Sequence, residues 1–231
     1  MNADDVGGVE GVVRRLYIYP VKSAAGVAVD AVEVDVFGPA RDRRWLVVDG
    51  EAGGRALTQR EAPPLALIRP SIGVDGGLAL EAPAMERLEL PPPSGIADGE
   101  ATREGGAPGA PTRRVTVWKS VVDAIDAGDE AADWVGRHLG RTCRLVHLPD
   151  DAVRRPPRHR RVGPGRLSFV DAAPFLVVTE AALEELNRRL VDPIPMDRFR
   201  PSIVVGGAGP HAEDDWPRVE IGGVALRRVK P

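Results

Sequence analysis

Short apolar runs separated by glycine and proline are the feature that most limits how this chain can fold. The 231 residues include 26 glycines and 22 prolines, and only 4% of the residues are aromatic. A run of four to eight apolar residues between such breaks is typical of a strand and too short for most helices. The sequence therefore predicts an α+β protein that is mainly β, with a core of valine, leucine, alanine and isoleucine.

The N-terminal part carries several candidate strands. Residues 12–21 are predicted to form a mostly buried strand, whereas in residues 29–36 valines alternate with Glu33 and Asp35, as in a half-buried strand. Two more short strands are predicted at 45–48 and 65–68. Strands at this close spacing favour a small antiparallel barrel or sandwich.

Two helices are predicted in the C-terminal half. The first begins at Asp129, taken as its N-cap, and ends at Gly140. The second follows Thr179 as its N-cap and runs to Pro193. Further strands are predicted at 114–118, 143–148, 175–178 and 203–205, and as a hairpin over 219–226 that turns at Gly222 and Gly223.

Two segments rich in proline, glycine or arginine interrupt these elements. Residues 91–112 are predicted to be a linker or insertion, and residues 154–166 a flexible, solvated loop. The sequence thus predicts an N-terminal barrel-like domain over residues 9–90 and a second domain, with further strands and a few helices, over residues 113–231.

The charge balance argues against nucleic acid or an anionic membrane as a partner. Lys and Arg number 31 against 34 Asp and Glu, so the net charge is −3. No apolar run approaches the ~20 residues of a membrane span, and residues 1–10 lack the features of a signal peptide. We therefore expect a small-molecule ligand, no membrane association and a cytoplasmic location.

Cysteine and histidine offer no evident metal site. Cys143 is the single cysteine, which excludes an intrachain disulfide or an all-cysteine metal site within the chain. The four histidines are dispersed without the spacing of metal ligands. No residue of the chain is predicted to bind a metal ion directly.

Three polar motifs are candidates for binding an anionic ligand. Lys22 and Ser23 follow a predicted strand, Arg43 lies beside Asp42, and Arg198 and Arg200 would project to one side of an extended segment. Each motif alone also fits a structural role: a solvated strand end, a surface ion pair and an ion-pair network.

Together these motifs resemble the MOSC family, of the kind that includes YcbX and the amidoxime-reducing components. YPVKSAAG (19–26), DRRWLVVD (42–49) and TQREAPPLALI (58–68) are similar to its N-terminal barrel. DAAPFLVVTEAALEELN (171–187), RFRPSIVV (198–205), AEDDW (212–216) and IGGVALRRVKP (221–231) are similar to its MOSC domain. The resemblance runs in order from about Val9 to the last residue.

This resemblance implies that residues 113–231 form a second β-barrel, the MOSC domain. It also implies a molybdenum-pterin cofactor and the reduction of N-hydroxylated compounds such as hydroxylaminopurines and amidoximes. It implies a separate electron donor, a flavin, haem or iron-sulfur protein. Pyridoxal phosphate, which belongs to a further domain of the family's sulfurase relatives, is not expected. The implied cofactor-binding residues are Lys22, Ser23 and Arg43 on one side, and Arg198, Arg200, Ser202, Glu213 and Asp214 on the other.

Two departures from the family pattern leave alternatives open. The family has Arg-Pro-Asn where this chain has Arg200, Pro201 and Ser202, and it continues past the final Val-Lys-Pro with a cysteine that ligates molybdenum, where this sequence ends at Pro231. The sequence is therefore interpreted as a truncated oxidoreductase or, alternatively, a non-catalytic protein that only binds the cofactor. A third interpretation, nucleic-acid binding through Arg154–Arg161, conflicts with the acidic chain and the lack of interleaved aromatics.

Overall fold

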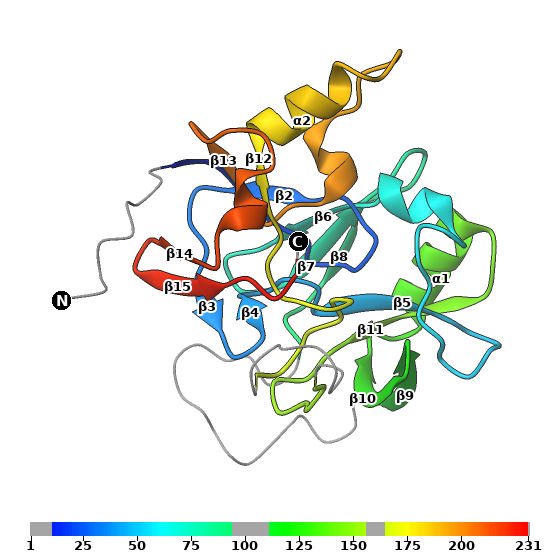
Figure 1. Ribbon diagram of the computed structural model, residues 1–231. Coiled ribbons are helices and arrows are strands. Elements are labelled where there is room, and N and C mark those ends of the chain that lie inside the picture. Colours follow the sequence, from blue (N-terminus) through cyan, green and yellow to red (C-terminus); the bar gives the residue numbers. More distant parts are fainter. Residues whose placement is uncertain (1–10, 94–110, 156–164, 231) are drawn as a thin grey trace. The chain divides into compact units, whose positions relative to one another are not determined.

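A computed structural model describes residues 11–93, 111–155 and 165–230 of the chain (Figure 1). These residues form two compact units. The larger contains residues 18–27, 33–93, 111–155 and 165–174, and the smaller contains residues 11–17, 28–32 and 175–230. The expectation of a mainly β, α+β protein is confirmed, because the described residues contain many short strands and two α-helices. Neither of these helices combines the length and apolar character that a membrane span requires.

The larger unit is built on two antiparallel sheets. One has the strand order β5-β11-β10-β9 and the other the order β6-β7-β8, with β3 and β4 forming a separate pair. The strands are β3 (Val34–Asp35), β4 (Gly38–Pro39), β5 (Trp45–Asp49), β6 (Arg69–Ile72), β7 (Leu78–Glu81), β8 (Leu88–Leu90), β9 (Thr112–Val117), β10 (Ser120–Asp126) and β11 (Cys143–His147), and the helices are η1 (Pro63–Leu67, 3-10) and α1 (Asp129–Leu139).

Strand β5 is central to the core of this unit because both of its faces are buried. Trp45 and Val47 lie in one hydrophobic cluster, while Leu46 and Val48 lie in a second. Successive residues of a strand point to opposite faces of its sheet, which assigns alternate residues to the two clusters. Burial of each of these side chains contributes on the order of 2 kcal/mol.

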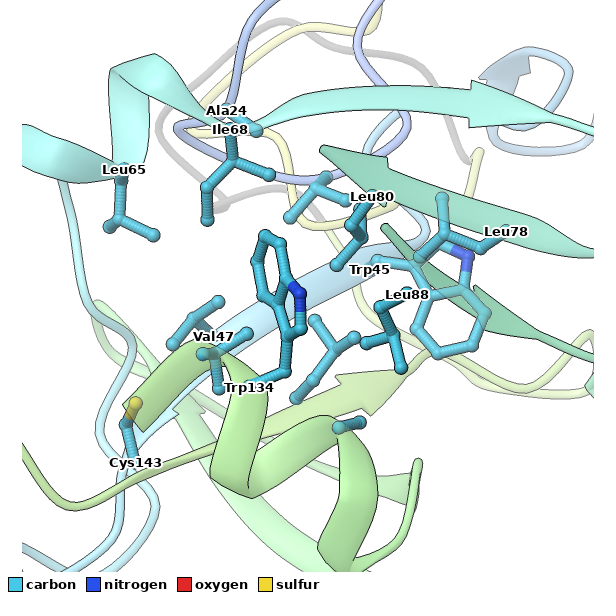
Figure 2. Packing of buried hydrophobic residues seen from close by; sticks show 14 of the residues in the cluster. Ala24, Trp45, Val47, Leu65, Ile68, Leu78, Leu80, Leu88, Trp134 and Cys143 are labelled. Atoms are coloured by element: carbon cyan, nitrogen blue, oxygen red, sulfur yellow. The ribbon is translucent and has the colours of Figure 1, made fainter. Parts of the chain in front are cut away.

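Helix α1 covers the first of these clusters. Figure 2 shows the indole of Trp134 projecting from the helix among Val47, Leu80 and Leu88. Its Nε1 donates a hydrogen bond to the carbonyl oxygen of Glu86 at 2.6 Å, so the one polar atom of the ring is satisfied. Trp134, the largest of the buried side chains of α1, thus joins the helix to a cluster that includes residues of β5, β7 and β8.

The ends of the helices follow local sequence signals. Gly140 ends α1 in the left-handed conformation, with φ of 64°, as predicted. The N-cap of α1 is Gly128 and not Asp129, which is already the first helical residue. Thr179 caps α2 (Glu180–Asn187) as predicted, and its side chain accepts a hydrogen bond from the Ala182 amide at 3.3 Å.

The smaller unit contains a mixed four-stranded sheet of order β12-β13-β1-β2. Strands β12 and β13 are parallel and are connected through α2, whereas β1 and β13 are antiparallel. The predicted hairpin is present as β14 and β15. The elements are β1 (Val12–Ile18), β2 (Val27–Val29), β12 (Val177–Thr179), α2 (Glu180–Asn187), η2 (Met196–Phe199, 3-10), β13 (Ile203–Gly206), η3 (Ala212–Asp215, 3-10), β14 (Arg218–Ile221) and β15 (Val224–Arg227).

Three predictions about the N-terminal strands are wrong. Residues 65–67 form the end of a 3-10 helix, because Pro63 and Pro64 set helical φ angles in its first turn, and Ile68 is the residue that caps it. The first strand is exposed over its first four residues and not mostly buried. In the alternating segment, the valines expected to face the core are exposed, at 44% for Val34 and 63% for Val36.

The compact units also do not divide at residue 90. Strand β5 pairs with β11 along its whole length, from Trp45 opposite His147 to Asp49 opposite Cys143. One sheet therefore combines strands from both sides of the linker predicted at 91–112. Of that linker, residues 94–110 lie outside the described residues, as do residues 156–164 of the predicted arginine-rich loop.

Candidate functional site

Three segments of the larger unit are joined by backbone hydrogen bonds around Lys22 and Arg43. The Lys22 amide donates to the Trp45 carbonyl at 2.8 Å, and the Arg43 amide donates to the Tyr19 carbonyl at 2.8 Å. The Phe169 amide donates to the Arg43 carbonyl at 2.9 Å. Two motifs that are separate in the sequence thus lie together, beside a third segment from residues 167–171.

The ammonium of Lys22 is buried in this site. The residue is 7% exposed, and Nζ donates to the Phe169 carbonyl at 2.8 Å and to Oδ1 of Asp171 at 2.5 Å. Burial lowers the pKa of Lys22, Asp171 opposes this effect, and nearby Arg43 and Arg154 add to it. Lys22 is therefore an oriented cation and not the solvated strand end that the sequence left open.

Asp171 connects Lys22 to Trp118. The indole Nε1 of Trp118 donates to the same carboxylate oxygen at 2.8 Å, and the Asp171 side chain is 62% exposed. Desolvation favours the neutral acid, but Lys22, Trp118 and Arg154 together hold the pKa of Asp171 below its ordinary value. Its other oxygen, Oδ2, has no hydrogen-bond partner among the described residues.

Arg43 is held beside Asp42, as its place in the sequence suggests. Its NH1 donates to Oδ2 of Asp42 at 2.6 Å, and its guanidinium lies 4.5 Å from the centre of the Tyr19 ring. Asp42 is fully buried and also accepts the Tyr19 amide at 2.8 Å. A buried carboxylate and an aromatic face thus fix the direction of the Arg43 guanidinium.

Arg154 is a member of the site that sequence reasoning missed. It was expected to lie in a solvated loop, but it is 4% exposed and donates to the carbonyls of Ser168 at 2.5 Å and Val170 at 2.7 Å. Its Nε is buried and has no partner among the described residues. The neighbouring Pro156 and Pro157 concealed this role, because an arginine run broken by prolines is typical of a solvated loop.

Asp171 and Trp118 were also missed as site residues. Asp171 is the first residue of the DAAPF motif, which indicated the family resemblance but no binding role for Asp171 itself. Trp118 lies at the end of a segment in which valine alternates with polar residues. A large aromatic residue at the end of such a strand, next to a turn, was the feature that could have indicated a binding role.

Backbone strain gathers at this site. Ser23, Arg43 and Trp118 have φ of 70°, 47° and 56°, the left-handed region that residues with a Cβ rarely adopt. Each such residue costs on the order of 1–2 kcal/mol. Strain of this kind persists where the surrounding structure holds the residue, and it clusters in binding sites.

The smaller unit places Arg198, Arg200 and Ser202 differently from the prediction. Arg198 lies in the 3-10 helix η2 and is exposed, and Arg200 follows it with a left-handed φ of 57°. The segment is not extended, so the argument that its two arginines share one side fails. Ser202 is buried, and its Oγ accepts the Leu176 amide at 3.3 Å.

Glu213 and Asp214 differ from each other in their hydrogen bonds. The carboxylate of Glu213 accepts both the amide and the hydroxyl of Thr179, at 3.0 and 2.8 Å. It therefore secures the junction between β12 and α2, which gives it a structural role. Asp214 lies half-buried in η3, where its amide donates to the His211 carbonyl at 3.0 Å, and its carboxylate makes no hydrogen bond or ion pair with another described residue.

The described residues do not form a metal site of their own. No group of three His, Cys, Asp or Glu among them is arranged to hold a metal ion. Cys143 is buried in β11, and burial raises the pKa of its thiol to about 11. A thiol in this state is a poor ligand for a soft metal.

Two surface hollows of the larger unit lie away from the candidate site. One follows α1 and the start of β11 and includes Arg137, Arg141 and Arg144, and the other adjoins Asp49. Neither contains Lys22, Arg43, Asp171 or any other residue predicted to bind a cofactor.

The chain belongs to the MOSC family. Residues 10–142 match the MOSC N-terminal beta barrel domain, and residues 164–231 match the MOSC domain. The resemblance stated from the motifs is therefore confirmed. The family models divide the chain between residues 142 and 164 and not in the region 91–112.

Several curated relatives are similar over almost the whole chain. Mitochondrial amidoxime-reducing component 1 of Mus musculus is 37% identical over 95% of this chain and 62% of its own length, and that of Homo sapiens is 34% identical over 95% and 63%. A molybdenum cofactor sulfurase of Oryza sativa subsp. japonica is 29% identical over 91% of this chain and 26% of its own length. The chain thus spans less than two thirds of these relatives.

A solution structure of a Bordetella bronchiseptica protein is 26% identical, with a TM-score of 0.38, over 53% of this chain and 92% of that chain. This likeness is too low to carry a structural argument.

Proposed function

We propose that this chain binds a molybdenum-pterin cofactor and belongs to an oxidoreductase that removes oxygen from N-hydroxylated compounds. The observation that carries the proposal is the group of buried cations around Lys22, in a chain whose relatives are named amidoxime-reducing components. When bound, the cofactor would supply the oxygen-atom chemistry, and the protein would bind and orient it.

The residues of the larger unit fit the anionic and hydrogen-bonding parts of such a cofactor. Lys22, Arg43 and Arg154 are three cations, whereas Asp42 and Asp171 are two carboxylates, so the group has a surplus of one positive charge. Lys22 has three N–H donors, of which two are occupied, and the Nε of Arg154 is unpaired among the described residues. A phosphate or an oxygen-rich heterocycle would satisfy these donors.

The chain's own residues would bind the cofactor with side chains that are already held in place. The buried carboxylate of Asp42 orients Arg43, and Asp171 orients Lys22, so neither cation must be ordered when the ligand binds. Ser23 is turned by its left-handed backbone and adds a hydroxyl next to Lys22. In the smaller unit, we propose Arg198, Arg200, Ser202 and Asp214 as further candidates, while the two bonds to Thr179 leave Glu213 with a structural role.

A protein that binds the cofactor without catalysis is the second candidate. It is favoured by Cys143, the one thiol of the sequence, which is buried and has a raised pKa. Nucleic-acid binding through Arg154–Arg161 is disfavoured, because Arg154 is committed to the carbonyls of Ser168 and Val170. For an active enzyme we propose a separate flavin, haem or iron-sulfur protein as electron donor. A cytoplasmic location stays a prediction.

Pterin and molybdenum content of the protein, purified from a host that makes the cofactor, test the proposal. We expect the wild-type chain to retain pterin, detected by fluorescence after oxidation. Lys22→Met keeps the length of the side chain and removes its charge, so we expect most of the pterin to be lost. Arg87→Met is the matched control, because Arg87 is exposed and pairs with Glu81 and Glu89.

Reduction of benzamidoxime with a chemical electron donor separates the two candidates. Activity of a pterin-loaded wild-type protein supports the oxidoreductase. Pterin without activity supports the binding protein. A wild-type chain that holds no pterin contradicts both candidates.

A further inference from the structure

Trp118 and Asp171 stand out because they create an open acceptor beside an exposed aromatic ring. Trp118 is 60% exposed at the turn between β9 and β10, although an apolar ring of this size is normally buried. It also has a left-handed φ of 56°, where glycine or asparagine is preferred. Hairpin formation alone explains neither the exposure nor the choice of residue.

The indole is nevertheless anchored in one orientation. Its Nε1 donates to Oδ1 of Asp171, 53 residues later in the chain, at 2.8 Å. Lys22 donates to the same oxygen at 2.5 Å. The ring is thus held at its polar edge, and its apolar surface stays available.

One carboxylate oxygen of Asp171 accepts no hydrogen bond within the part of the chain that the structure describes. Oδ1 accepts two donors, whereas Oδ2 has no partner among the described residues, and the side chain is largely exposed. The carboxylate is ionised at neutral pH, so Oδ2 is a strong acceptor for an N–H or O–H group.

The surrounding charges decide which ligands this acceptor suits. Arg154 and Lys22 act electrostatically on Asp171, and Arg43 acts on Lys22. Because cations outnumber carboxylates in this group, a positively charged ligand gains no net attraction there. A neutral ligand with a hydrogen-bond donor can donate to Oδ2 without being repelled by these cations.

We propose that Trp118 and Asp171 form a recognition site for a neutral, planar ligand that carries an N–H or O–H donor, such as an aromatic amidoxime. The indole provides a flat surface for stacking, and Oδ2 accepts the donor. This inference rests on the proposed function, since it assigns the substrate-binding part of the same site. A protonated amidine, the product of amidoxime reduction, binds more weakly because it is a cation.

Titration of the cofactor-free, full-length chain with benzamidoxime tests this site without catalysis. The indole N–H signals of the four tryptophans are followed by NMR, and Trp118→Phe identifies the signal of Trp118. We expect this signal to shift on titration. Trp118→Ala should weaken binding about tenfold or more, because it removes the stacking surface, and Asp171→Asn should weaken it by a similar factor. Trp118→Phe keeps an aromatic face and should retain most of the affinity.

Val121→Ala is the matched control. Val121 is also exposed on β10 of the same hairpin and has no part in the site, so its substitution should leave binding unchanged. Urea unfolding of each variant confirms that it is folded before it is titrated.

Three results would overturn the inference: equal affinity of wild type and Trp118→Ala, equal affinity of wild type and Asp171→Asn, or tighter binding of benzamidine than of benzamidoxime. Pterin content is measured separately. Binding through Trp118 in a chain that never holds pterin would therefore reject the proposed function and retain the ligand site, and the reverse result would reject the site alone.

Discussion

The ammonium nitrogen of Lys22 lies 2.5 Å from Oδ1 of Asp171, although 149 residues separate the two in the chain. One partner is buried and the other is largely exposed. Solvent can therefore reach the carboxylate, while the ammonium depends on it for charge compensation. This asymmetry determines how the pair should respond to mutation.

Asp171→Asn should lower the free energy of unfolding by about 1–3 kcal/mol near neutral pH, because a buried cation loses its counter-ion. The depressed pKa of Asp171 means that its contribution is present above the ordinary value of 3.8 and is lost as the pH falls below it. Urea unfolding of wild type and variant should therefore differ near neutral pH and converge in acid. A variant as stable as wild type at neutral pH would show that the pair does not stabilise the fold.

His147→Phe should make the protein less sensitive to acid. Burial, with a smaller effect from Arg44, lowers the pKa of His147 from 6.5 to about 3. Between these values the unfolded chain takes up a proton that the folded chain does not, so wild-type stability falls as the pH drops through this window. Phenylalanine can keep the edge contact with Trp45, whose ring centre lies 4.7 Å away. Unfolding measured across this range should show a shallower decline for the variant, and parallel curves would contradict the prediction.

Arg144→Met should destabilise the protein by about 3 kcal/mol, because Asp126 is a buried carboxylate. Arg144 contacts both oxygens of Asp126, at 2.6 and 2.9 Å, and Arg113 is the other cation bound to it. Arg114→Met is the comparison, because Arg114 lies on the hairpin of β9 and β10 that also contains Asp126. This variant removes an exposed ion pair with Asp123 and should lower the free energy of unfolding by less than about 1 kcal/mol. Denaturant unfolding compares the two, and equal effects would argue against a special role for Asp126.

Cys143 should resist alkylation in the native protein. Its thiol is buried in β11 and has a pKa of about 11, so the thiolate is scarce near neutral pH. Mass spectrometry after treatment with iodoacetamide should show little modification of the native chain and complete modification in denaturant. Rapid modification of the native chain would show an accessible thiolate and would reopen Cys143 as a metal ligand.

Trp118→Gly should change stability by less than about 1 kcal/mol, because relief of the left-handed backbone offsets the lost hydrogen bond to Asp171. Ala84 has a similar φ of 58° and no side-chain hydrogen bond to lose, so Ala84→Gly should raise stability by up to about 1 kcal/mol. Thermal unfolding of both variants measures the difference. A large loss for Trp118→Gly would mean that the indole is mainly a structural residue.

Much of the candidate site could be predicted from local motifs. Lys22, Ser23 and Arg43 were identified from sequence, and the structure brings them together. Arg154 could not be recognised, because its burial depends on contacts with the carbonyls of Ser168 and Val170, and the path of the chain between these residues does not follow from the sequence. The prediction that Arg198 and Arg200 project to the same side was wrong, because the segment forms a 3-10 turn and is not extended.

The sequence by itself determined the features that depend on near neighbours. The helix stop at Gly140, the cap at Thr179 and the hairpin turn at Gly222 and Gly223 each involve residues within a few positions, so their signals are readable without the fold. Only the tertiary structure decided that β5 pairs with β11 across the predicted domain boundary, and that Lys22 and Trp118 meet at one oxygen of Asp171. The physical reason is that strand pairing and burial of charge depend on contacts between distant segments, and the pattern of residues along the chain does not specify those contacts.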